Sequence, residues 1–224
     1  MILLFPLVIF FFFVSVICVI IGVTRVVAYQ KRQERLFELG RFAAQNGWTF
    51  NAKNTPNQFQ NANAYRIFNV GHSKQMGGFM QRQAQNGEQF FVFDYEYATG
   101  HGKSRRQYKQ TIFAVRSAHL DLPYFALYPE GFFSFLGEMI GYNDIDFGSH
   151  PAFSKRYKLS GQNEAHIRHV FQPQILSRLE MAGNLNIDGG GNYLFVYWQG
   201  TAVKIANLNA FIGEGMNILH FFRR

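Results

Sequence analysis

The chain has 224 residues, with 22 Lys and Arg against 14 Asp and Glu, for a formal net charge of +8. Hydrophobic residues make up 48% of it and aromatic residues 17%, which excludes an intrinsically disordered chain because this much apolar surface can form a core. The single cysteine, Cys18, lies in an apolar run, so the rest of the sequence holds no disulfide partner and fits a reducing compartment.

The N-terminus is an uncharged apolar run that covers residues 2–23 and is followed by Thr24. As an α-helix, this run would extend about 33 Å, enough to cross a hydrocarbon core of about 30 Å. A cleaved signal peptide would have a basic segment before a shorter apolar core, followed by a small-residue cleavage site, and none of these is present. Residues 1–24 are therefore predicted to be an uncleaved transmembrane anchor.

The flanks of the run predict its orientation. Only the N-terminal amino group precedes it, whereas Arg25, Lys31, Arg32, Arg35 and Arg41 follow it closely. Because positively charged flanks stay on the cytoplasmic side, we expect a single-pass protein with its N-terminus outside and its C-terminal domain in the cytoplasm. The same cations are expected to face the membrane surface, in particular Arg25, Lys31, Arg32 and Arg35.

Next in the chain, residues 25–47 predict an amphipathic juxtamembrane helix, which Asn46-Gly47 ends. Residues 48–64 are rich in Asn and Gln and predict a polar loop. Residues 65–224 predict the folded cytoplasmic domain. In its first half we expect a short strand at 66–70 and a hairpin of 79–85 with 89–98 through Asn86-Gly87, and then strands at 107–117 and 123–128.

The second half of the domain mixes helices with strands. We expect a helix at 132–140, a strand at 153–159, a helical region at 164–182 divided by Pro173, a hairpin of 185–188 with 192–198 around three glycines, and an amphipathic helix at 202–222. This order predicts an α+β fold, in which an N-terminal transmembrane helix precedes a mainly antiparallel β-sheet domain with packed helices. Alternating Phe91, Phe93, Tyr95 and Tyr97 predict the buried face of the sheet; the alternative is a platform on which bases stack.

The segment FSKRYKLSGQNEAHIRHVFQPQILSRLE, which begins at Phe153, resembles a domain of unknown function from membrane-anchored bacterial proteins. The upstream segments FDYEYATGHGK and LPYFALYPE are similar in style to the same group. The resemblance covers about residues 65–200 and implies a membrane-tethered domain in a bacterium. It implies no activity, cofactor or catalytic residue.

A basic cluster follows the strand at 89–98, and it contains His101, Lys103, Arg105, Arg106 and Lys109 with no acidic residue among them. Gly102-Lys103-Ser104 matches the end of a phosphate-binding loop, but Tyr97 stands where that motif requires its first glycine. We expect an exposed hairpin loop; the alternative is a contact with anionic lipid head groups. Nucleic acid is not expected, because no RNA-binding signature accompanies the charges.

Two groups of residues are candidates for a catalytic or metal-binding site. Asp144 and Asp146, with His150 nearby, could form a hydrolytic or metal site, but we favour a turn followed by a strand with an exposed acidic face. His166 and His169 share a helix face but lack a third metal ligand.

The sequence therefore contains no complete catalytic constellation, and no cofactor or metal ligand is assigned. The leading hypothesis is a membrane-tethered, non-enzymatic interaction or scaffolding module whose partners are the lipid bilayer and an unidentified protein. The alternatives are a hydrolase that uses Asp144, Asp146 and His150, and a sensor of anionic lipid surfaces.

Overall fold

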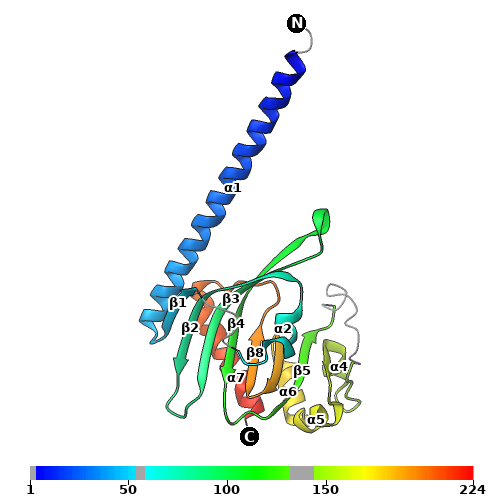
Figure 1. Cartoon of the computed structure of the whole chain (residues 1–224). Helices are drawn as coiled ribbons and strands as arrows, with labels where there is room; N and C mark the ends of the chain where they lie inside the picture. Colours follow the sequence, from blue (N-terminus) through cyan, green and yellow to red (C-terminus); the bar gives the residue numbers. More distant parts are fainter. Residues whose placement is uncertain (1–3, 54–58, 132–143, 224) are drawn as a thin grey trace.

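The computed structural model describes residues 4–53, 59–131 and 144–223. Its first element is one continuous helix, α1 (Leu4–Gln45), which projects from a domain built on a single sheet (Figure 1). The domain has the predicted α+β architecture, in which helices pack on an antiparallel sheet. The helical spacing noted at residues 132–140 falls outside the described residues.

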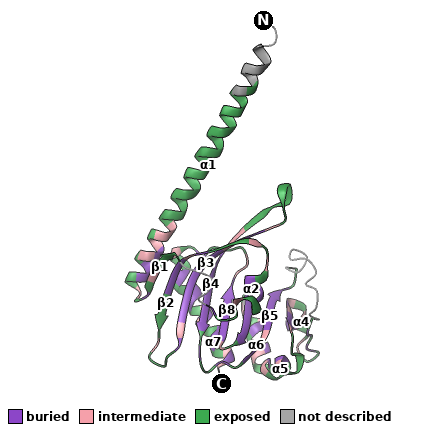
Figure 2. Ribbon diagram, in the orientation of Figure 1, coloured by how far each residue is buried: buried purple, intermediate pink, exposed green. Residues whose placement is uncertain are grey.

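Helix α1 unites the predicted anchor and the predicted juxtamembrane helix without a break. Residues 12–34 of the helix are exposed, whereas its last turns are covered by the domain (Figure 2). In the described chain, α1 is the one helix that is long and apolar enough to cross a membrane. It ends where predicted: Gly47 has a φ of 70°, and the Trp48 amide donates to the Ala43 carbonyl at 2.9 Å.

Eight antiparallel strands form the sheet, in the order β1-β2-β3-β4-β8-β7-β5-β6. Their bounds are β1 Thr49–Lys53, β2 His72–Gln83, β3 Gln89–Thr99, β4 Arg106–Arg116, β5 Leu122–Pro129, β6 Tyr157–Gly161, β7 Asn186–Gly191 and β8 Tyr193–Tyr197. The helices are α2 Arg66–Asn69, α4 Pro151–Arg156, α5 Glu164–Val170, α6 Pro173–Met181 and α7 Leu208–Phe222, with short 3-10 turns η2 Ala62–Ala64, η3 Gly102–Ser104 and η4 Ile205–Asn207.

The two faces of the sheet belong to two hydrophobic clusters, because neighbouring side chains of a strand point to opposite faces. On β3, Phe90 and Val92 belong to the cluster that also contains residues of α1, α5, α6 and α7. Phe91 and Phe93 lie on the other face, where Phe59 packs against both rings with centroids 5.5 Å apart. All four aromatic residues of the β3 stripe are buried, which confirms that the stripe is a core face.

Three segments differ from their predicted structure. Residues 66–69 form the single helical turn α2, because Ile67 and Phe68 are both buried against the aromatic face rather than alternating. Residues 151–156 form α4, which begins at Pro151, a residue suited to the first turn of a helix. The predicted loop at 48–64 contains β1, which pairs with β2 at the edge of the sheet.

The two predicted hairpins form, with different turns. The β2–β3 connection runs from Ala84 to Glu88, and of Asn86-Gly87 only Gly87 has a positive φ. In the second hairpin, Gly189 and Gly190 are strand residues of β7 rather than turn residues. A Cβ on Gly190 would lie 2.3 Å from the Tyr124 ring, so glycine allows the ring to pack on the strand.

Candidate functional site at the junction of helix α1 and the sheet

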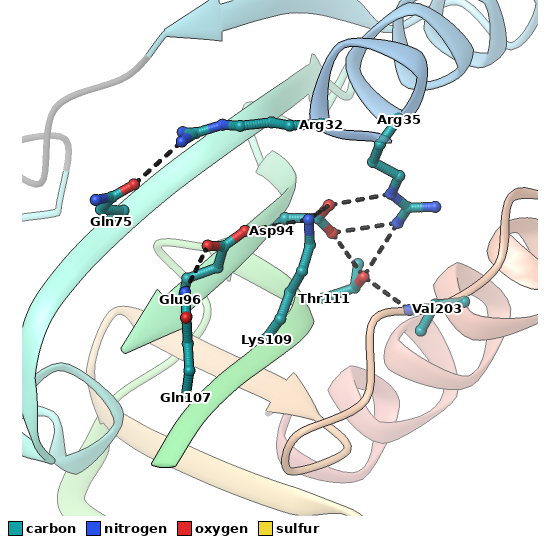
Figure 3. Close-up of polar contacts among 9 residues, drawn as sticks. All are labelled: Arg32, Arg35, Gln75, Asp94, Glu96, Gln107, Lys109, Thr111 and Val203. Atoms are coloured by element: carbon teal, nitrogen blue, oxygen red, sulfur yellow. Dashed lines mark hydrogen bonds and ion pairs between the residues drawn. The ribbon is translucent and has the colours of Figure 1, made fainter. Parts of the chain in front are cut away.

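The junction between α1 and the sheet is built around the carboxylate of Asp94, which alternation places on the helix-covered face of β3. Its side chain is only 7% exposed. The guanidinium of Arg35 on α1 donates to both carboxylate oxygens, with Nε 3.0 Å from Oδ2 and Nη2 3.2 Å from Oδ1 (Figure 3). This two-point contact fixes the rotation of α1 about its axis, as well as its position on the sheet.

Thr111 connects this ion pair to the rest of the domain. It lies opposite Asp94 in the β3–β4 register, and its hydroxyl donates to Asp94 Oδ1 at 2.8 Å. The Thr111 hydroxyl oxygen in turn accepts from Arg35 Nη2 at 3.4 Å and from the Val203 amide at 2.9 Å. Because Val203 precedes η4 and α7, the network joins α1, two strands and the start of the C-terminal helical region (Figure 3).

More exposed contacts surround the pair. Lys109 Nζ lies 3.8 Å from Asp94 Oδ2 and 3.1 Å from Glu96 Oε1. One turn before Arg35, Arg32 donates to Gln75 Oε1 on β2 at 3.2 Å. Solvent screens these outer contacts, so we assign most of the electrostatic fixation of α1 to the buried Arg35–Asp94 pair.

Below the ion pair, α1 docks through apolar packing. Leu39, Phe42 and Ala43 are buried in the core cluster of the domain. Space for Leu39 comes from a register shift in β2 next to Gly77-Gly78, where Gly78 has a φ of 60°. A Cβ on Gly78 would lie 2.5 Å from Leu39 Cδ1, so a larger residue would require the Leu39 side chain to shift, in addition to the strain of the positive φ. The α1 end is therefore part of the domain core.

The eight cations predicted to contact the membrane surface fall into three groups. Arg25 and Lys31 are exposed on α1, above its junction with the domain. Arg32, Arg35 and Lys109 lie in the junction described above, where they contact Gln75, Asp94 and Glu96. The remaining three are exposed: Lys103 and Arg105 in the loop between β3 and β4, and Arg106 at the start of β4.

The proposed catalytic trio has structural contacts of its own. Asp144 accepts from the Leu159 amide at 3.1 Å and lies 3.3 Å from Lys158 Nζ. The ring of His150 contacts the hydroxyls of Ser149 and Ser177, at 3.0 and 3.4 Å. Asp146 is exposed, and its carbonyl accepts from Arg168. Within the described ranges, no three His, Cys, Asp or Glu side chains gather closely enough to hold a metal ion.

A buried polar cluster lies on the other half of the sheet, around Asp188, the last residue of the strand predicted at 185–188. Asp188 is fully buried and accepts from the hydroxyls of Tyr128 and Tyr197 at 3.1 and 3.0 Å. Burial raises its pKa to about 6, although both hydroxyls and the charge of Arg66 favour the ionised form. The Arg66 guanidinium lies 4.4 Å from the centre of the Tyr128 ring.

Alternation could have placed Asp188 inside the sheet. It lies between Ile187 and the glycines of a strand, and the signal was hidden because Asp before Gly usually marks a turn. Arg66 also borders a cavity of about 140 Å³ with Asn63, Asn69 and Tyr124.

Comparisons with known proteins bear on the fold. No protein-family profile matches the sequence, and no curated protein matches it. The resemblance to a bacterial domain of unknown function therefore stays a prediction. Among solved structures, the chain is similar to the mycobacterial trehalose monomycolate transport factor A, TtfA, with a TM-score of 0.58 and 12% sequence identity. The match covers 84% of this chain and 91% of TtfA, so the two share an overall fold.

Proposed function

We propose that this chain is a single-pass protein of the bacterial inner membrane whose cytoplasmic α+β domain is a non-enzymatic interaction module for a membrane protein. The observation that carries the proposal is the junction of α1 with the sheet. The helix runs without a break from its apolar part into the domain core, where Arg35 and Asp94 fix its rotation.

A fixed junction suits a protein that presents one face to a neighbour in the same membrane. A domain on a flexible tether would sample all orientations. It would lose this orientational freedom on binding a partner, and the contacts with the partner would have to offset that entropic cost. Here the freedom is already lost on folding, so a partner embedded nearby meets a pre-oriented surface. The basic residues after the apolar run support the cytoplasmic orientation of the domain.

The likeness to TtfA supports a search for the partner among membrane transport proteins. TtfA is described as a transport factor for trehalose monomycolate, and it shares the fold of this chain at 12% identity. We carry over from this name a role in transport, and not the cargo. The hydrolase alternative receives no comparable support, because Asp144 and His150 are engaged with different neighbours.

Photocrosslinking in native membranes tests this function. A photoreactive amino acid replaces an exposed residue on each of two faces of the full-length chain, Met181 at the end of α6 and Gln85 at the β2–β3 turn. We expect one face to give a discrete adduct with a membrane protein. The adduct should weaken with Asp94→Asn, which loosens the junction, and persist with Arg41→Ala, which removes an exposed cation of α1.

Equal adducts from both faces, unchanged by Asp94→Asn, would indicate random collisions and contradict the proposal. Turnover of a hydrolysable substrate by the purified full-length chain, abolished by Asp144→Asn, would replace it with the enzymatic alternative.

A further inference from the structure

The loop between β3 and β4, residues 100–105, forms with Arg106 at the start of β4 a compact basic surface that we term the basic tip. Lys103, Arg105 and Arg106 are all exposed, and the sequence from Tyr97 to Tyr108 contains no acidic residue. None of these three cations lies in an ion pair within the part of the chain that the structure describes. Their charge is thus presented to the surroundings.

The shape of the basic tip is fixed by its own contacts. Gly100 has a φ of 65°, and its carbonyl lies 2.9 Å from His72 Nε2 on β2. The rings of His72 and His101 stack with centroids 4.8 Å apart. The Ser104 hydroxyl donates to the His101 carbonyl at 2.8 Å. A defined loop conformation means that the three cations point outward without further ordering.

The direction of the tip follows from how α1 lies along the sheet. Arg35 contacts Asp94, and one turn nearer the N-terminus Arg32 contacts Gln75, which pairs with Glu96. The direction from Arg35 to the apolar run along α1 is therefore the same as the direction from Asp94 to the basic tip along β3. Figure 1 shows the β3–β4 hairpin projecting from the domain on the side from which α1 rises.

The tip also extends far enough to meet the membrane surface. From Asp94 to Gly100, β3 advances six residues, about 20 Å at ~3.3 Å per residue. From Arg35 back to Arg25, the first cation after the apolar run, α1 advances ten residues, about 15 Å at ~1.5 Å per residue. Both paths start from one ion pair, so the tip reaches the level at which α1 leaves the apolar run.

We propose that the basic tip is a second membrane contact, which binds anionic lipid head groups of the leaflet from which α1 emerges. The inference rests on the membrane anchoring in the proposed function and adds a lipid specificity to it. Each cation near an anionic surface strengthens binding roughly five-fold. Together the three cations and the helix hold the domain at two points, which sets its tilt in a bilayer of given thickness.

The test uses the full-length chain in vesicles, with Cys18→Ala as background and an environment-sensitive fluorophore on Ser104→Cys. The matched reporter is Gln85→Cys at the β2–β3 turn, the opposite end of the sheet. In vesicles containing phosphatidylglycerol, lipid-borne quenchers should quench the Ser104 reporter and not the Gln85 reporter. In purely phosphatidylcholine vesicles, or at high salt, quenching of the Ser104 reporter should fall at least several-fold.

Charge-neutralising variants distinguish lipid binding by the basic tip from lipid binding by the overall positive charge of the chain. Lys103→Gln, Arg105→Gln and Arg106→Gln together should abolish the dependence on anionic lipid, roughly a hundred-fold weakening by the same per-cation factor. The control neutralises three exposed cations elsewhere, Arg116, Lys155 and Arg178, and should leave quenching unchanged.

Three outcomes would overturn the proposal: equal quenching in neutral and anionic vesicles, equal quenching with both triple variants, or a Ser104 reporter that responds to added RNA and not to lipid. A chain that fails to remain in the vesicles after alkaline extraction contradicts the anchoring itself. The two failures are therefore distinguishable.

Discussion

Arg35 and Asp94 are 59 positions apart in the sequence and form the contact that joins the apolar helix to the sheet. The carboxylate is almost fully buried, and the guanidinium spans both of its oxygens. Removal of one partner from a buried pair leaves an uncompensated charge, whereas removal of both does not.

Arg35→Met should therefore lower the free energy of unfolding by about 3 kcal/mol, because Asp94 stays buried with only Lys109 and Thr111 beside it. The double variant Arg35→Met with Asp94→Leu should recover much of that loss. Urea unfolding of the full-length chain in detergent, followed by fluorescence of Trp48 and Trp198, measures both. Additive losses in the double variant would show that the pair is not coupled.

Gly78→Ala should destabilise the domain more than Gly87→Ala. Both residues have a positive φ, which costs an alanine about 1 kcal/mol. At Gly87 a Cβ meets nothing within 4 Å, whereas at Gly78 it would lie 2.5 Å from Leu39 Cδ1. We expect Gly78→Ala to cost about 2 kcal/mol more in the same unfolding experiment. Equal losses would mean that the approach of α1 does not depend on this glycine.

The buried Asp188 should make stability depend on pH. Its pKa is about 6 in the fold against 3.8 for a free side chain, so between these values the folded state binds more protons than the unfolded state. Its contribution to stability is therefore full below about pH 4 and is lost as the pH rises through about 6, a change of about 3 kcal/mol. Asp188→Asn should remove this slope from the unfolding free energy measured between pH 4 and 7. An unchanged slope would mean that Asp188 does not titrate there.

Chemical labelling of a single cysteine tests the orientation of the chain in the membrane. With Cys18→Ala as background, Met181→Cys provides one exposed thiol, since Met181 is 80% exposed. A membrane-impermeant maleimide should label inverted inner-membrane vesicles and leave intact spheroplasts unlabelled, because the proposed orientation places the domain in the cytoplasm. Labelling of intact spheroplasts would place the domain on the opposite side.

Local patterns predicted the elements whose causes are local. Pro173 correctly divides α5 from α6, Asn46-Gly47 ends α1, and the aromatic alternation on β3 predicts its buried face. In contrast, Gly78 and Gly190 are set by what packs on them, Leu39 and Tyr124. These partners are distant in sequence, so the residues next to each glycine indicate only the end of a strand or a turn.

The candidate site was the part least accessible to sequence reasoning. Alternation along β3 places Asp94 on the face opposite the aromatic stripe, but alternation alone cannot show that α1 covers this carboxylate. Arg35 was interpreted as part of the membrane-facing basic flank, because positive charge after an apolar run usually has that role. Only the fold brings the two together.

The continuity of α1 gives the chain a mechanical property. Since no hinge separates the apolar part of the helix from the sheet, the helix acts as a lever arm. Helices tilt when their apolar length differs from the thickness of the bilayer. In a thinner bilayer, the sheet would rotate by the same angle as the helix, and one end of the domain would swing toward the lipid. The thickness of the bilayer would thereby set the orientation of the folded domain relative to the membrane.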